Sequence, residues 1–119
     1  MDADYEKYNG IVEDYISEKR PKDSVHVKYS VGKNGTYTDV NKVAHEGKIQ
    51  FIVLKDEGEF WRHDDYESPV LENPTWLEVC LHANDMIIKT GDLHHIYLEG
   101  INVDTEVEGV SVANFSMGS

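Results

Sequence analysis

Four side chains in the second half of the chain are of types that bind transition metals. Glu78 stands four positions before His82, so a helix would carry both on one face. His94 and His95 are neighbours, and successive residues of a strand point to opposite faces, so only one of them could join a shared ion. The set predicts a candidate divalent-metal site made of Glu78, His82 and one of the adjacent histidines.

The spacing of these residues matches none of the HExxH, HxH or paired CxxC metal motifs. The competing interpretation is that one histidine is buried with its ring nitrogens hydrogen-bonded, while the others lie on the surface. The sequence favours this second interpretation.

The single cysteine, Cys80, could be a nucleophile if His82 or His94 served as its base. It lies on an apolar stripe with Val79 and Ala83, where burial would raise the thiol pKa and leave the group inert. Because free cysteines are among the most buried residues, the sequence predicts that Cys80 packs in the core.

A second candidate site stands at the end of a predicted strand. It combines an indole, a guanidinium, an imidazole, carboxylates and a phenol in consecutive residues, namely Trp61, Arg62, His63, Asp64, Asp65 and Tyr66. Such a cluster could line a polar ligand pocket or form a hot spot for a partner. The alternative, which the sequence favours, is that Trp61 packs at the edge of the core and the two aspartates are solvated.

Negative charge is concentrated in the second half of the chain. Residues 1–62 carry 12 acidic and 10 basic side chains, a net of −2, whereas residues 63–119 carry 11 acidic side chains and one base, Lys89, a net of −10. This field repels nucleic acids and anionic lipid, and it attracts cationic surfaces. We therefore expect no direct binding to nucleic acid or membrane. A merely solvated acidic face is the alternative explanation.

The first residues and the apolar runs of the chain do not have the pattern expected of an export signal or a membrane span. The first residues are acidic and polar, and the longest apolar run, Phe51–Leu54, is far below the ~20 residues of a spanning helix. A lone cysteine cannot form an internal disulfide. These features predict a cytoplasmic protein.

The first half of the chain predicts one helix and two hairpins. Apolar residues recur at helical spacing over 4–18, and Pro21 ends that pattern. Residues 24–62 are expected to form two hairpins with a short helix between them, which Thr38 would cap and Gly47 would end. The most apolar strand is expected at Lys48–Leu54.

The second half predicts a surface loop, the main helix and two strands. Residues 63–73 are polar and read as the loop. Asn73 and Pro74 have the types found at a helix start, so the main helix is expected over 74–90, with the final strands over 94–115. The whole pattern over 1–119 predicts a single α+β domain: a mostly antiparallel sheet of about five or six strands, packed against the long helix and the N-terminal amphipathic helix.

These observations favour a non-catalytic binding or interaction module whose acidic C-terminal half meets a cationic protein surface, or which self-associates as a homodimer. A metal-binding protein or metal-dependent enzyme built on the His and Glu set is one alternative. A DNA-mimic inhibitor, whose carboxylates imitate phosphates, is another.

Overall fold

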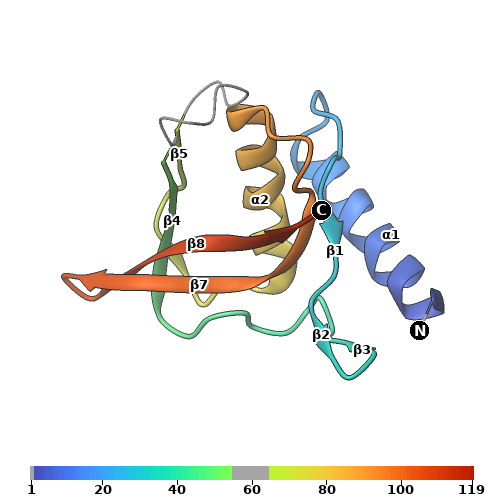
Figure 1. The fold of residues 1–119 in the computed structure, drawn as a ribbon, viewed down its shortest axis with the longest axis horizontal. Coiled ribbons are helices and arrows are strands. Elements are labelled where there is room, and N and C mark those ends of the chain that lie inside the picture. The colour runs from blue at the N-terminus through green and yellow to red at the C-terminus, as the bar shows by residue number, and fades with distance from the viewer. Residues whose placement is uncertain (1, 55–64) are drawn as a thin grey trace.

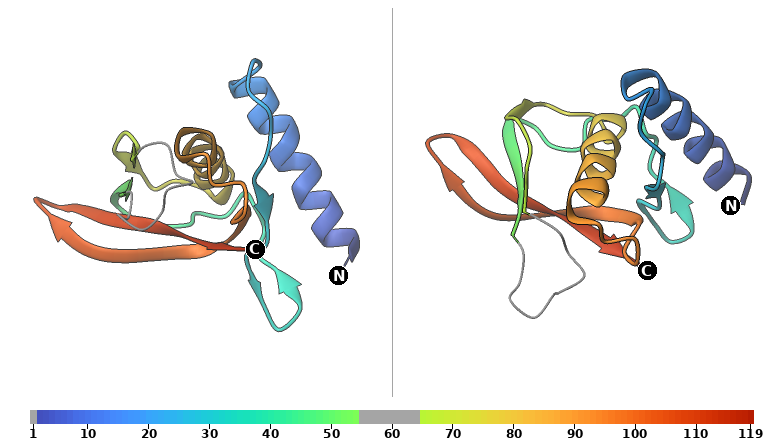
Figure 2. Two further views of the ribbon diagram at one scale, coloured as in Figure 1. Left: turned by 45° about the horizontal axis from the view of Figure 1, so that its top comes forward. Right: turned by 90° about the horizontal axis from the view of Figure 1, so that it is seen from above.

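The fold of this protein is α+β, with two helices and a mixed sheet (Figure 1). The computed structural model describes residues 2–54 and 65–119. Helix α1 spans Asp2–Lys19 and helix α2 spans Trp76–Thr90. In the figures α2 lies behind the sheet, and α1 lies outside α2 and beside β1 (Figure 2).

The main sheet has the strand order β1-β7-β8-β4-β5, and β6 also pairs with β4. Its strands are β1 (Lys28–Tyr29), β4 (Lys48–Val53), β5 (Tyr66–Glu67), β6 (Leu71–Glu72), β7 (Tyr97–Val107) and β8 (Val110–Gly118). A separate hairpin joins β2 (Gly32–Lys33) to β3 (Thr36–Tyr37).

The sheet is mixed, so the prediction of a mostly antiparallel sheet is wrong. β1 runs parallel to β7, and β4 runs parallel to β8, whereas β7–β8, β4–β5 and β4–β6 are antiparallel. Parallel neighbours need a long connection, and the segment between β4 and β8 supplies one because it includes α2. Local alternation of side chains does not report such long-range pairings.

The core lies between α2 and the sheet and is closed by α1. Ile16 of α1, Phe51 of β4, Ile87 of α2 and Leu98 of β7 are fully buried. The rings of Phe51 and Phe115 stack with centroids 4.2 Å apart. Burial of this apolar surface is the main term that favours the folded state.

Two asparagine side chains hold residues 24–31, which the sequence predicts as the first strand of the first hairpin. Asn84 of α2 accepts hydrogen bonds from the His26 and Val27 amides (2.7 and 3.1 Å) and donates to the Ser24 carbonyl (3.0 Å). Asn9 of α1 accepts from the Tyr29 amide at 2.7 Å and donates to the Tyr29 carbonyl at 3.1 Å. These side chains take the place of a neighbouring strand, so only Lys28–Tyr29 is paired as β1.

No helix forms between Thr38 and Gly47, where the sequence predicts a short one. Asp39 instead accepts from the amide of Asn41, in an Asx turn. The backbone then bonds to the start of α2: the Trp76 amide donates to the Lys42 carbonyl and the Leu77 amide to the Val40 carbonyl. These bonds satisfy carbonyls that a local helix would otherwise use.

The predicted loop over 63–73 contains two short strands, β5 and β6, that pair with β4. The predicted second hairpin would need residues 59–62, which lie outside the described residues. Helix α2 begins at Trp76, later than the predicted residue 74, because Thr75 is its N-cap. Thr75 and Glu78 form a capping box there.

Neither helix in the described parts of the chain is both long and apolar enough to cross a membrane.

We predict that Asn84→Leu lowers the free energy of unfolding by about 3 kcal/mol, because two amides and one carbonyl lose their partner at a fully buried position. Denaturant unfolding measures this loss. Asn102→Leu, at an exposed position, is the matched control and should change stability by less than about 0.5 kcal/mol. Equal losses in both variants would contradict the assigned role of Asn84.

Candidate functional site

The β7–β8 hairpin forms an arm whose outer strand has a free edge. A two-residue turn joins the strands, with Glu108 at φ 51° and Gly109 at φ 81°, as a type I′ turn requires. β1 pairs with β7 only at Tyr97 and Leu98. Beyond Leu98, no strand in the described residues pairs with the outer edge of β7. The edge over 100–107 therefore presents backbone groups to solvent.

The far part of this arm is exposed and acidic. Residues 102–109 are all exposed, and Val103 and Val107 keep 51% and 55% of their side-chain exposure. The arm carries Asp104, Glu106 and Glu108, and neither β7 nor β8 contains a Lys or Arg. Exposed edge strands commonly carry lysines that hinder pairing with other chains. The exposed part of β7 carries carboxylates instead.

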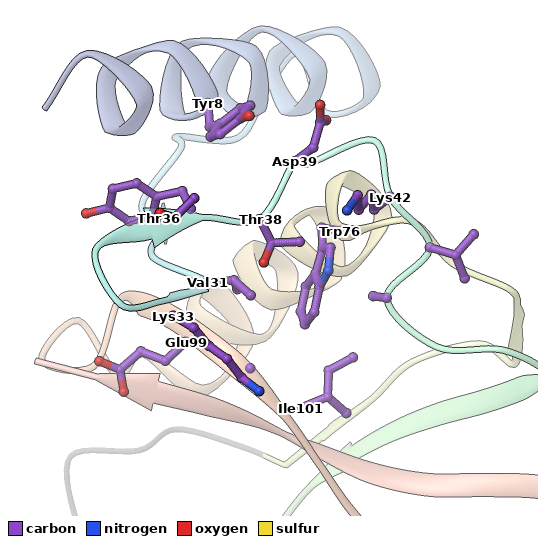
Figure 3. A pocket seen from close by; sticks show the side chains of 15 residues that line it. Tyr8, Val31, Lys33, Thr36, Thr38, Asp39, Lys42, Trp76, Glu99 and Ile101 are labelled. Atoms are coloured by element: carbon purple, nitrogen blue, oxygen red, sulfur yellow. The ribbon is translucent and has the colours of Figure 1, made fainter. Parts of the chain in front are cut away.

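A groove of about 820 Å³ opens where β1 and β7 separate. It is lined by Tyr8 of α1, by the β2–β3 hairpin with the adjoining segment 38–44, by the first residue of α2 and by residues 99–101 of β7 (Figure 3). Its apolar surface includes Val31, Ile101 and the indole of Trp76, and its polar groups include two lysines, Lys33 and Lys42. The groove is continuous with the free edge because β7 residues line it.

The groove walls are held by defined contacts. The buried Tyr29 hydroxyl donates to the Thr38 carbonyl at 2.6 Å, and the Tyr29 ring meets the Trp76 ring edge-on at 6.3 Å. Gly32 is needed in the hairpin, since a Cβ there would come within 2.2 Å of the Thr36 carbonyl oxygen. The groove is therefore largely pre-formed by the fold.

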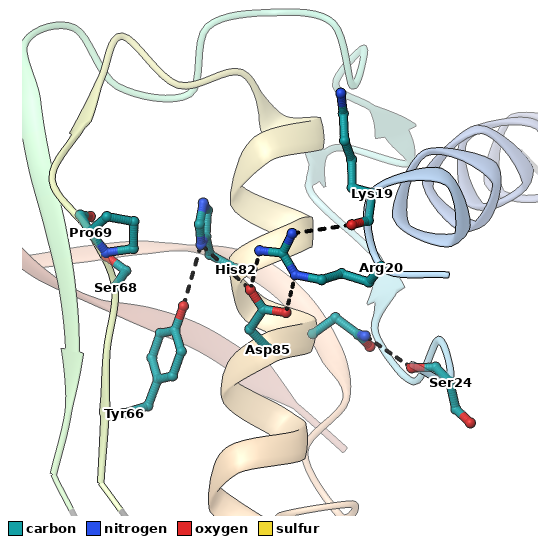
Figure 4. Close-up of polar contacts among 9 residues, drawn as sticks. Lys19, Arg20, Ser24, Tyr66, Ser68, Pro69, His82 and Asp85 are labelled. Carbon is teal, nitrogen blue, oxygen red and sulfur yellow. Dashed lines mark hydrogen bonds and ion pairs between the residues drawn. The ribbon is translucent and has the colours of Figure 1, made fainter. Parts of the chain in front are cut away.

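A polar network joins the end of α1, helix α2 and β5 (Figure 4). Arg20 donates two hydrogen bonds to the Asp85 carboxylate, at 3.1 and 2.9 Å. His82 Nδ1 lies 3.8 Å from Asp85 Oδ2 and 3.4 Å from the Tyr66 hydroxyl. Burial lowers the pKa of His82, against the opposing effect of Asp85, and burial also raises the pKa of Tyr66.

This network has the residue types of an acid–base site, but its groups are buried or already paired and serve a structural role. His82 is only 8% exposed and Tyr66 also 8%. Both are held in their neutral forms near neutral pH, and the carboxylate of Asp85 is occupied by the guanidinium of Arg20. The network therefore ties α1 and β5 to α2.

The structure separates the predicted metal ligands. Glu78 caps its own helix, and His82 belongs to the polar network. His95 Nδ1 lies 3.0 Å from buried Asp92, while His94 is exposed and uses its amide to bond Asp92. Across residues 2–54 and 65–119, no three His, Cys, Asp or Glu side chains gather where they could hold an ion.

The other predicted candidates are placed as follows. Trp61, Arg62, His63 and Asp64 lie outside the described residues. Asp65 is exposed, whereas Tyr66 is buried against the core, where its ring tilts toward Phe115. Cys80 is fully buried, and this burial raises its thiol pKa, which confirms its prediction as a core residue.

Sequence reasoning missed the groove and both asparagines. The groove combines residues from four separated segments, so no local motif marks it. Asn9 and Asn84 stand inside helical patterns, where a polar residue is usually read as surface. A polar residue within the wide apolar stripe of α2 was the available signal for Asn84.

We predict that His82 makes stability depend on pH. Its native pKa is below the unfolded value of about 6.5, so the unfolded chain takes up the proton first and stability falls as the pH drops below about 6.5. His82→Gln should lose less stability than wild type between about pH 7.5 and about pH 5.5, with one proton contributing at most about 1.4 kcal/mol per pH unit.

Urea unfolding at the two pH values measures this difference. His94→Gln is the control, because His94 is exposed and should leave the wild-type pH dependence unchanged. If His82→Gln keeps the full dependence, another group carries it.

The comparisons with known proteins assign no family: no protein family model, no curated protein and no solved structure matches this chain.

Proposed function

We propose that this protein is a non-catalytic binding module that takes up a cationic, extended segment of a partner protein as an added strand on the outer edge of β7. The observation that carries the proposal is the edge over 100–107, which is exposed from residue 102 onward, has no paired strand among the described residues and bears only acidic charges.

Backbone pairing supplies the first part of the recognition. An extended segment that lies beside 100–107 would satisfy the outward amides and carbonyls of β7, which is the principle of strand addition. The edge is about 25 Å long at the usual rise per residue. A segment of about eight residues therefore matches it.

Charge supplies the second part. Lys or Arg side chains of the added strand would stand beside Asp104 and Glu106, and cross-strand pairs of opposite charge are favourable. Val103 and Val107 flank these acids with exposed apolar surface, and the ladder with β8 shifts register between Val103 and Thr105. A partner segment that combines basic and β-branched residues fits both features.

The same charges disfavour self-association through this edge. A twofold pairing of two β7 strands would bring Asp104, Glu106 and Glu108 of both copies into one interface, and like charges facing each other across strands are destabilising. A cationic partner is therefore preferred over a second copy of the chain.

We predict that a peptide of about eight residues with alternating lysine and valine binds with a dissociation constant that rises with salt. The triple variant Asp104→Gln, Glu106→Gln, Glu108→Gln should bind the peptide at least about 10-fold more weakly, because the edge loses the negative charges that complement the lysines. Isothermal titration calorimetry at roughly 50 mM and roughly 300 mM NaCl measures both effects.

The matched control neutralises three exposed acids of α1, Glu6→Gln, Glu13→Gln and Glu18→Gln, which changes the net charge by the same amount. It should leave binding nearly unchanged. Equal weakening in the two triple variants would show a general charge effect and would contradict a site on β7.

Backbone methylation of the peptide separates strand addition from simple charge attraction. Two peptides are N-methylated at every second residue, in opposite phases, so only one phase removes the amides that face β7. One phase should abolish binding and the other should keep it. If both bind equally, no strand is added.

A further inference from the structure

The structure assigns the groove at the start of the free edge to the C-terminal residue of the partner segment: its apolar side chain would rest against Trp76, and its carboxylate would meet Lys33, with Lys42 adding positive charge at the other end of the indole. This inference rests on the proposed strand addition and specifies which end of the segment is recognised.

The groove lies at the end of the path that an added strand would follow. β1 occupies the outer edge of β7 as far as Leu98, whose carbonyl accepts from the Ser30 amide at 2.9 Å. The chain then turns away into the β2–β3 hairpin, and the groove opens beside Gly100 and Ile101. A strand running from the tip of the arm toward β1 must therefore end in the groove.

The sign of the charge changes along this path. The edge carries acidic groups only, whereas two lysines, Lys33 and Lys42, line the groove. Neither lysine forms an ion pair with any residue that the structure describes. Ammonium groups would repel a basic side chain of the partner but would attract a terminal carboxylate.

The two acids of the groove are turned away from its floor. In Figure 3 the ammonium group of Lys33 is directed toward Ile101 and Lys42 lies at the other end of the Trp76 indole, while the carboxylates of Asp39 and Glu99 are directed to the margins. Glu99 lies against β8, since a Cβ added at Gly118 would come within 2.6 Å of its carboxylate. The floor therefore presents positive charge beside apolar surface.

The floor suits an apolar terminal side chain. Val31, Ile101 and the Trp76 indole supply apolar contact, and the volume of about 820 Å³ exceeds what one large side chain needs. With its C-terminus here, the segment runs toward the start of β7 and so pairs antiparallel with it. This direction allows antiparallel pairing along the edge, with irregular spacing where β7 shifts register between Leu98 and Gly100 and between Val103 and Thr105.

The test compares three forms of one peptide with alternating basic and valine residues and a final leucine: the free acid, the C-terminal amide, and the acid extended by glycines. We expect the free acid to bind about 10-fold more tightly than the other two. If net charge alone decided the affinity, the amide would bind more tightly than the free acid, because the amide carries more net positive charge and the protein carries −12.

The double variant Lys33→Gln, Lys42→Gln should reduce the preference for the acid to less than about 2-fold. Both lysines are exposed, and so are Lys19 and Lys22 of the control variant Lys19→Gln, Lys22→Gln, which should keep the full preference. Unfolding curves of both variants check that the fold is retained.

This inference would be overturned, but strand addition would stand, if the acid and the amide bound equally well while neutralising Asp104, Glu106 and Glu108 still abolished binding. A preference for the acid that persists in the Lys33 and Lys42 variant would also overturn it. Absence of binding by every peptide would overturn the proposed function itself, and the inference with it.

Discussion

The arrangement of this protein depends on how the backbone between Ser24 and Val31 is hydrogen-bonded. One side of this segment pairs with β7 through the amides of Lys28 and Ser30. The other side faces no strand in the described residues and is bonded by Asn84 and Asn9, two side chains from different helices. Because buried backbone groups must find partners, these contacts fix where the segment lies between the helices and the sheet.

The position of this segment shapes the candidate binding surface. β1 covers only the first residues of β7, so the rest of that edge has no paired strand in the described parts of the chain. The chain that leaves β1 folds into the β2–β3 hairpin, and the segment 38–44 returns to the start of α2. The edge and the groove are thus two consequences of a short β1. The edge carries carboxylates only, and the groove also carries Lys33 and Lys42, so the charge changes along the length of the surface.

Local patterns predicted the elements whose cause is local. The apolar periodicity of 4–18 and 74–90 corresponds to α1 and α2, and the apolar run from Lys48 corresponds to β4. Burial of Cys80 followed from its place on the stripe of α2. The helix expected after Thr38 does not form, because backbone groups of that segment bond to the start of α2, which stands far away in the sequence. Similarly, the predicted metal ligands lie apart because Glu78 caps α2 and His82 faces Asp85.

The sequence by itself determined the α+β composition, the two helices, the central apolar strand and the excess of negative charge after residue 62. These properties depend on neighbouring residues or on simple counts. Only the tertiary structure decided that β4 and β8 are parallel, that most of the outer edge of β7 has no paired strand among the described residues, and that Lys33 and Lys42 line a groove at its beginning. The physical reason is that strand pairing and surface charge depend on which distant segments come into contact, and side-chain periodicity does not specify those long-range contacts.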